Sequence, residues 1–131
     1  MILLDTNVVV AFLNGNELIS RRIQDEIDKV SLSTLVIAEL DYGAKVSQKS
    51  KENIEKLYRF LDVVQIVLFD VECAKIFGTI KSKLLMIGKP TGEVDALIAA
   101  TAKAHDAILA TANNRHFENI EGLKLEVWQI E

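Results

Sequence analysis

The sequence has very little cysteine or proline. Its 131 residues include one cysteine, Cys73, and one proline, Pro90. A single cysteine excludes an intrachain disulfide, and we expect the thiol to be buried as a small apolar group. No repeat, low-complexity tract or Pro/Gly/Ser-rich linker interrupts the chain, which predicts a single domain over residues 1–131.

Long apolar segments are also missing. No run of about 18 uncharged apolar residues occurs, so no membrane span is expected. No basic stretch precedes an apolar one at the N-terminus, so we expect no signal peptide and a cytoplasmic protein. Acidic residues outnumber basic ones by 19 to 15, for a net charge of −4. This balance argues against a protein that coats nucleic acid, but it leaves room for a local RNA site.

Strand and helix patterns alternate along the chain. Strands are expected over residues 2–4, 30–33, 65–69, 108–110 and 123–130. Helices are expected over residues 6–13, 17–29, 34–45, 47–63, 71–87 and 93–105, with Ser33 or Thr34 as the cap of the third. This order predicts an α/β fold, a three-layer α/β/α sandwich with a central, mostly parallel sheet of about five strands.

The start of the chain is its most informative segment. Residues 2–4 read as a buried parallel strand that ends at Asp5 and is followed by Thr6 and Asn7. Ligands bind at the carboxyl ends of strands in open α/β sheets, so Asp5 is a candidate metal ligand or nucleophile. The alternative is that Asp5 only caps the helix that begins at Thr6.

Two further acids are candidates for the same site. Glu39 lies in the otherwise apolar run 35–40, which predicts a buried carboxylate held by a metal or a partner. A solvent-facing residue of an amphipathic helix is the alternative. Asp95 lies in the first turn of a helix after the loop 88–92, so we expect it to face the same rim as Asp5. The helix dipole alone would also favour an acid there.

Three carboxylates with no cysteine or histidine nearby would form a hard-oxygen site. Such a site suits Mg²⁺ or Mn²⁺ rather than a structural zinc ion. The metal would activate water as the nucleophile for phosphodiester hydrolysis. Without metal, repulsion among the acids should raise at least one of their pKa values.

Five segments in order support this interpretation. They are Leu-Leu-Asp-Thr-Asn at 3–7, Ala-Glu-Leu-Asp-Tyr-Gly at 38–43, Gly-Lys-Pro-Thr-Gly-Glu-Val-Asp-Ala-Leu-Ile-Ala-Ala at 88–100, Thr-Ala-Asn at 111–113 with His-Phe at 116–117, and Gly-Leu-Lys-Leu-Glu-Val-Trp at 122–128. Together they resemble the PIN domain family, specifically VapC-like toxins of toxin–antitoxin pairs. The resemblance implies a metal-dependent ribonuclease with Asp5, Glu39 and Asp95 as its catalytic and metal-binding acids. It also implies a tRNA or rRNA substrate, an inhibitory antitoxin and a homodimer.

The chain departs from the family pattern at one point. The family usually has a fourth acid at the position of Asn113 or His116, and neither residue is acidic here. This departure leaves open a one-metal site or a weaker second metal, and also a catalytically weak or inactive PIN-like module that binds RNA or protein. Asn7, Thr111 and Asn113 are predicted to orient water or the ligand carboxylates. An ordinary Asn-rich turn at 111–117 is the alternative.

Two surfaces are candidates for partners. Lys89 and Arg115 are expected to contact RNA phosphates, because an acidic protein needs cations at the rim of its site. Alternatively, both are simply solvated surface charges. Several apolar helix stripes are expected to be exposed, with part of this surface forming a homodimer interface and part receiving the antitoxin. One such stripe comprises Ile76, Ile80, Leu84 and Ile87.

A phosphotransfer domain is the other class of enzyme with acids at strand ends. A receiver-like domain needs adjacent acids after its first strand, and a haloacid-dehalogenase-type phosphatase needs Asp-x-Asp. Residues 5–7, Asp-Thr-Asn, meet neither requirement. No glycine-rich phosphate-binding motif occurs elsewhere. The ribonuclease therefore remains the leading prediction.

Overall fold

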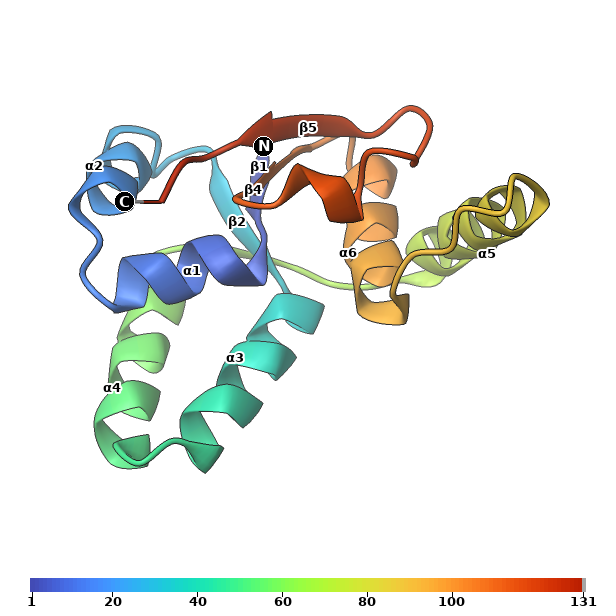
Figure 1. Cartoon of the computed structure of the whole chain (residues 1–131). Helices are drawn as coiled ribbons and strands as arrows, with labels where there is room; N and C mark the ends of the chain where they lie inside the picture. The colour runs from blue at the N-terminus through green and yellow to red at the C-terminus, as the bar shows by residue number, and fades with distance from the viewer. Residues whose placement is uncertain (131) are drawn as a thin grey trace.

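A five-stranded sheet forms the centre of the molecule (Figure 1). The computed structural model describes residues 1–130. The strands are β1 (Ile2–Leu4), β2 (Val30–Ser33), β3 (Gln65–Val67), β4 (Ile108–Thr111) and β5 (Lys124–Val127). Their order is β3-β2-β1-β4-β5, and every neighbouring pair is parallel. All five carboxyl ends therefore meet at one edge of the sheet.

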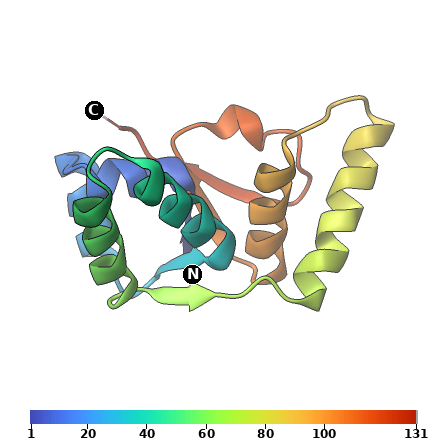
Figure 2. The ribbon, with the colours of Figure 1, turned by 90° about the horizontal axis from the view of Figure 1, so that it is seen from below.

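Helices cover the sheet on both sides. They are α1 (Thr6–Leu13), α2 (Glu17–Asp25), α3 (Thr34–Val46), α4 (Ser50–Leu61), α5 (Val71–Met86) and α6 (Glu93–Ala104), with a short 3₁₀ helix, η1 (Asn114–His116). Figure 2 shows α1 and α4 on one side of the sheet and α5 with α6 on the other. The predicted α/β sandwich is confirmed. Among residues 1–130, no helix has the length and apolar character needed to cross a membrane.

Polar residues directly before the first turn start several helices. Asp5, Asn16, Ser33 and Asp70 each accept a hydrogen bond from a backbone N–H in the first turn of α1, α2, α3 and α5, respectively. These bonds satisfy amides that otherwise have no partner within the helix. Ser33, one of the two predicted caps, is confirmed in this role.

Three elements are shorter than their predicted ranges. α2 ends at Asp25, although the apolar pattern predicts a helix to residue 29. The backbone N–H groups of Glu26 and Lys29 instead donate the hydrogen bonds that close two turns before β2. Ile27 still packs against the core, so the apolar spacing continues after the helical hydrogen bonding has stopped. α4 is likewise shorter than the predicted 47–63, and β5 is shorter than 123–130.

The predicted exposed stripe on α5 is wrong in its central part. Ile80 and Leu84 are each only 3% exposed, because α6 packs along this face of α5. Ile76 is half-buried, and Ile87 is exposed. Cys73 is fully buried, as expected.

Candidate active site

The centre of the site lies where β1 and β4 end side by side. Leu4 pairs with Ala110, so the next residues, Asp5 and Thr111, are neighbours across the sheet. Asp5 is 5% exposed. Its Oδ1 accepts a hydrogen bond from the backbone N–H of Thr6, and its Oδ2 accepts one from the Thr111 hydroxyl, both at 2.8 Å. Asp5 therefore caps α1 and also presents a fixed carboxylate at the carboxyl edge.

Glu39 reaches this edge from α3. Its Oε1 accepts a hydrogen bond from the Thr6 hydroxyl at 2.6 Å. Thr6 directly follows Asp5 in the chain, so this bond holds the Glu39 carboxylate beside the segment that carries Asp5. The prediction that Glu39 is buried is wrong, because its side chain is exposed. An exposed carboxylate held by one hydroxyl can move towards an ion at low cost.

Asp95 approaches from the first turn of α6. Its Oδ2 lies 3.3 Å from Nδ1 of His116, whose Nε2 is 3.1 Å from the amide nitrogen of Asn113. The backbone N–H of Asn113 donates to the Thr111 hydroxyl at 3.1 Å. These contacts connect Asp95 to Asp5 through the loop after β4. The expectation that no histidine lies near the acids is wrong.

Burial and repulsion from neighbouring acids raise the pKa values of Asp5 and Asp95. Burial raises the pKa of Asp5, although bonds from Thr111 and Thr6 oppose the shift, and the charge of Glu39 raises it further. Burial also raises the pKa of Asp95, with smaller increases from Asp5 and Glu39. The expectation of at least one raised pKa is confirmed, but burial rather than repulsion is the main cause. These couplings place the three carboxylates within electrostatic reach of one another.

The donor set fits a hard divalent ion that keeps part of its water. Across the described residues, the one group of three His, Cys, Asp or Glu side chains with all donor atoms within 4.8 Å does not include these acids. Asp5, Glu39 and Asp95 are therefore more widely spaced. Mg²⁺ usually retains several waters and takes only one or two protein carboxylates directly, so this spacing suits it.

The remaining predicted residues lie around the same edge. The Asn7 side-chain oxygen accepts from the backbone N–H of Ala112 at 3.3 Å and so joins α1 to the loop after β4. Lys89 and Arg115 are both exposed. The Thr91 hydroxyl donates to the His116 carbonyl at 2.8 Å, which links the loop after Lys89 to the turn that carries Arg115.

A parallel α/β sheet with acids along its carboxyl edge defines a class of protein that can hold a hard divalent ion there. The PIN domain family model matches residues 2–123, and the chain belongs to this family as a VapC-like member. It is 36% identical to ribonuclease VapC2 of Haemophilus influenzae and 31% identical to the tRNA(fMet)-specific endonuclease VapC of Shigella flexneri, with 96% of each chain covered.

The fold agrees equally well with a solved structure. VapBC2 from Rickettsia felis, bound to a DNA fragment from its promoter, superposes with a TM-score of 0.93 at 33% identity. The match covers 98% of this chain and all of the other. Nucleases of the family generally use a divalent metal.

Proposed function

We propose that the chain is a Mg²⁺- or Mn²⁺-dependent endoribonuclease that acts as a toxin in the cytoplasm and is inhibited by a cognate antitoxin. The convergence of Asp5, Glu39 and Asp95 on one edge of the sheet carries the proposal. The similarity to VapC ribonucleases, one of them specific for tRNA(fMet), supports RNA as the substrate, and we propose an RNA of the tRNA or rRNA class. The R. felis toxin–antitoxin structure supports an antitoxin partner.

Each residue of the proposed site has a distinct task. Asp5, Asp95 and Glu39 would hold the ion, which would supply a Lewis acid that activates water and neutralises charge on the scissile phosphate. Thr111 and the Thr6 amide fix both oxygens of Asp5. The Thr6 hydroxyl orients Glu39, and His116 contacts Asp95. Asn113 positions the His116 ring.

Cleavage of a panel of tRNA and rRNA by the purified chain tests this function. We expect products with Mg²⁺ or Mn²⁺ and none after chelation, because the proposed nucleophile is water that the metal activates. If no divalent metal supports cleavage of any RNA in the panel, the proposal fails, and the inactive RNA- or protein-binding module becomes the better description.

Restoring a fourth acid should strengthen metal binding. Asn113→Asp or His116→Asp adds a carboxylate beside Thr111 or Asp95, and we expect at least one of them to lower the Kd for Mn²⁺ by about tenfold. Calorimetric titration measures this change. Asn114→Asp, which adds the same charge to an exposed position of the same turn, is the matched control. Equal affinities for all three variants and the wild type would reject a fourth ligand position here.

RNA phosphates are proposed to contact Lys89 and Arg115. Replacing both with Ala should weaken RNA binding and reduce the salt slope of log K by about 1.4 to 1.8, the value for two lost phosphate contacts. Filter binding across a salt series checks this expectation. The control, Lys29→Ala with Lys124→Ala, removes two exposed cations next to the amino ends of β2 and β5, at the opposite edge of the sheet. If the two double variants behave alike, the contacts are not specific.

Self-association is proposed through the end of α5. Leu85 and Met86 are 81% and 83% exposed, and Ile87 follows them at 60%. Leu85 and Met86 therefore join Ile87, the exposed end of the predicted stripe, as a candidate contact for a second copy or the antitoxin. Sedimentation at micromolar concentration should show a dimer, and Leu85→Lys with Met86→Lys should shift it to monomer. A wild-type protein that sediments only as a monomer contradicts the homodimer.

A further inference from the structure

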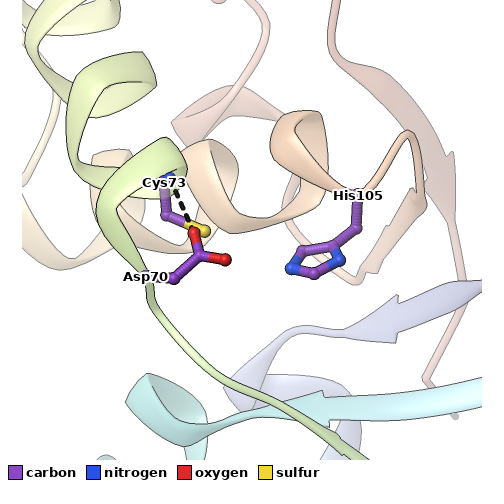
Figure 3. Close-up of side chains that lie close together, drawn as sticks. All are labelled: Asp70, Cys73 and His105. Atoms are coloured by element: carbon purple, nitrogen blue, oxygen red, sulfur yellow. Dashed lines mark hydrogen bonds between the residues drawn. The ribbon is translucent and has the colours of Figure 1, made fainter.

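A second group of metal-ligating side chains lies between α5 and α6 (Figure 3). Asp70 and Cys73 come from the start of α5, and His105 caps the end of α6. One carboxylate oxygen, the thiol sulfur and one imidazole nitrogen all lie within 4.8 Å of one another. Three donors of three chemical kinds thus converge from segments more than thirty residues apart in the sequence.

This group is separate from the proposed active site. His105 follows Asp95 by ten residues along α6, which corresponds to about 15 Å along the helix axis. The two sites therefore lie at opposite ends of α6. None of the contacts that connect Asp5, Glu39 and Asp95 involves the second group.

The donors differ in kind from those of the active site. Thiolate and imidazole are ligands for zinc and cobalt, whereas the carboxylates at the sheet edge suit magnesium. Three protein ligands with one open position are compatible with tetrahedral zinc. Asp70 and His105 are exposed, so water can reach the fourth position, while Cys73 supplies a buried sulfur.

We propose that a transition-metal ion of the Zn²⁺ class binds to Asp70, Cys73 and His105. The ion would link the first turn of α5 to the end of α6. The bound ion would stabilise the packing of α5 on α6. The packing of α5 on α6 already brings the three donor atoms within 4.8 Å of one another, so small side-chain movements are enough to reach coordination distance.

The helix cap and the metal site can coexist. One oxygen of Asp70 accepts the backbone N–H of Cys73 at 3.0 Å, and a carboxylate has a second oxygen for an ion. That hydrogen bond, with a smaller contribution from His105, lowers the pKa of Asp70 and keeps it ionised. Burial raises the pKa of the Cys73 thiol, so metal binding must release a proton and should tighten as pH rises.

Cobalt titration of the metal-free protein tests the site. Because Cys73 is the single cysteine, a sulfur-to-cobalt charge-transfer band reports this thiolate and no other group. We expect the band in the wild type, its loss in Cys73→Ser, and at least about tenfold weaker binding in Asp70→Asn and in His105→Asn. Zn²⁺ should displace the cobalt and abolish the band. Glu72→Gln, an exposed acid on the same turn of α5, is the matched control and should keep wild-type affinity.

Two results would overturn the proposal. The first is no charge-transfer band in the wild type at millimolar Co²⁺. The second is a band that keeps its full strength in both Asp70→Asn and His105→Asn, which would mean that the thiolate binds cobalt alone. Asparagine preserves the cap at position 70, and His105 is exposed, so these two variants decide the question even if Cys73→Ser fails to fold.

Discussion

Asp5→Asn is expected to lower the rate of RNA cleavage by more than about 100-fold. Mutating a residue that only hydrogen-bonds a metal ligand already lowers metal affinity or activity by about 10- to 100-fold, and Asp5 is proposed to be a ligand itself. Asparagine keeps the shape of the side chain but cannot offer two anionic oxygens. Single-turnover cleavage with Mg²⁺ or Mn²⁺ measures the loss. Asp25→Asn, an exposed acid on α2, is the matched control and should cleave like the wild type. Chelator-sensitive cleavage at the full rate by Asp5→Asn, in a nuclease-free preparation, would contradict the proposed site.

The same variant should not lose stability. Burial raises the pKa of Asp5 in the folded, metal-free protein, so the stability linked to its proton is complete below the ordinary value of 3.8 and is lost as pH rises through the raised value. At neutral pH, asparagine removes the penalty for the buried charge and still caps α1. Asp5→Asn should melt no lower than the metal-free wild type, and the difference should shrink as pH falls. Loss of activity then cannot be attributed to unfolding.

Trp128→Ala should destabilise the fold by about 3 to 5 kcal/mol. Trp128 is fully buried directly after β5. Its indole N–H donates to Glu126 at 2.9 Å, and the Arg22 guanidinium lies 4.5 Å from the ring centroid. Arg22 also pairs with Glu126, so the ring is part of a contact that holds β5 to α2. Truncation leaves a cavity and breaks this network.

Urea unfolding followed by far-ultraviolet circular dichroism measures that loss. Fluorescence is unsuitable, because the variant lacks the only tryptophan of the chain. Val127→Ala, at a neighbouring position that is 47% exposed, should cost much less and serves as the control. A change below about 1 kcal/mol for Trp128→Ala would mean that the C-terminal segment adds little to the fold.

The order of the elements and the position of Asp5 follow from local patterns. The apolar residues before Asp5 and Ser33 predict β1 and β2. Asp5 and Ser33 themselves predict where the next helices begin, because both residues are common helix caps. Parallel pairing then brings the residues after β1 and β4 to one edge. Each of these steps depends on residues that are close in sequence, or on the common direction of the strands.

The exposure of Glu39 could not be predicted from an apolar run alone. Six consecutive residues cover more than one turn of a helix, so they point in every direction around its axis. Val36 and Leu40, four residues apart, are the buried pair, while Glu39 lies on the exposed face. The contact between His116 and Asp95 depends on the geometry of the loop after β4, and the group of Asp70 and His105 depends on the packing of α5 against α6. The spacing of these residues in the sequence predicts neither contact.

The hydrogen bond between Asp5 and Thr111 spans 106 positions of the chain. At about 5 to 20 residues per second, a ribosome needs about 5 to 20 s to synthesise the segment between these two residues. During that interval β1 can pair with β2, but the central strand has an open edge and the Asp5 carboxylate lacks its hydroxyl partner. A nascent chain therefore completes the site only after β4 has been synthesised, and a product terminated before β4 lacks it.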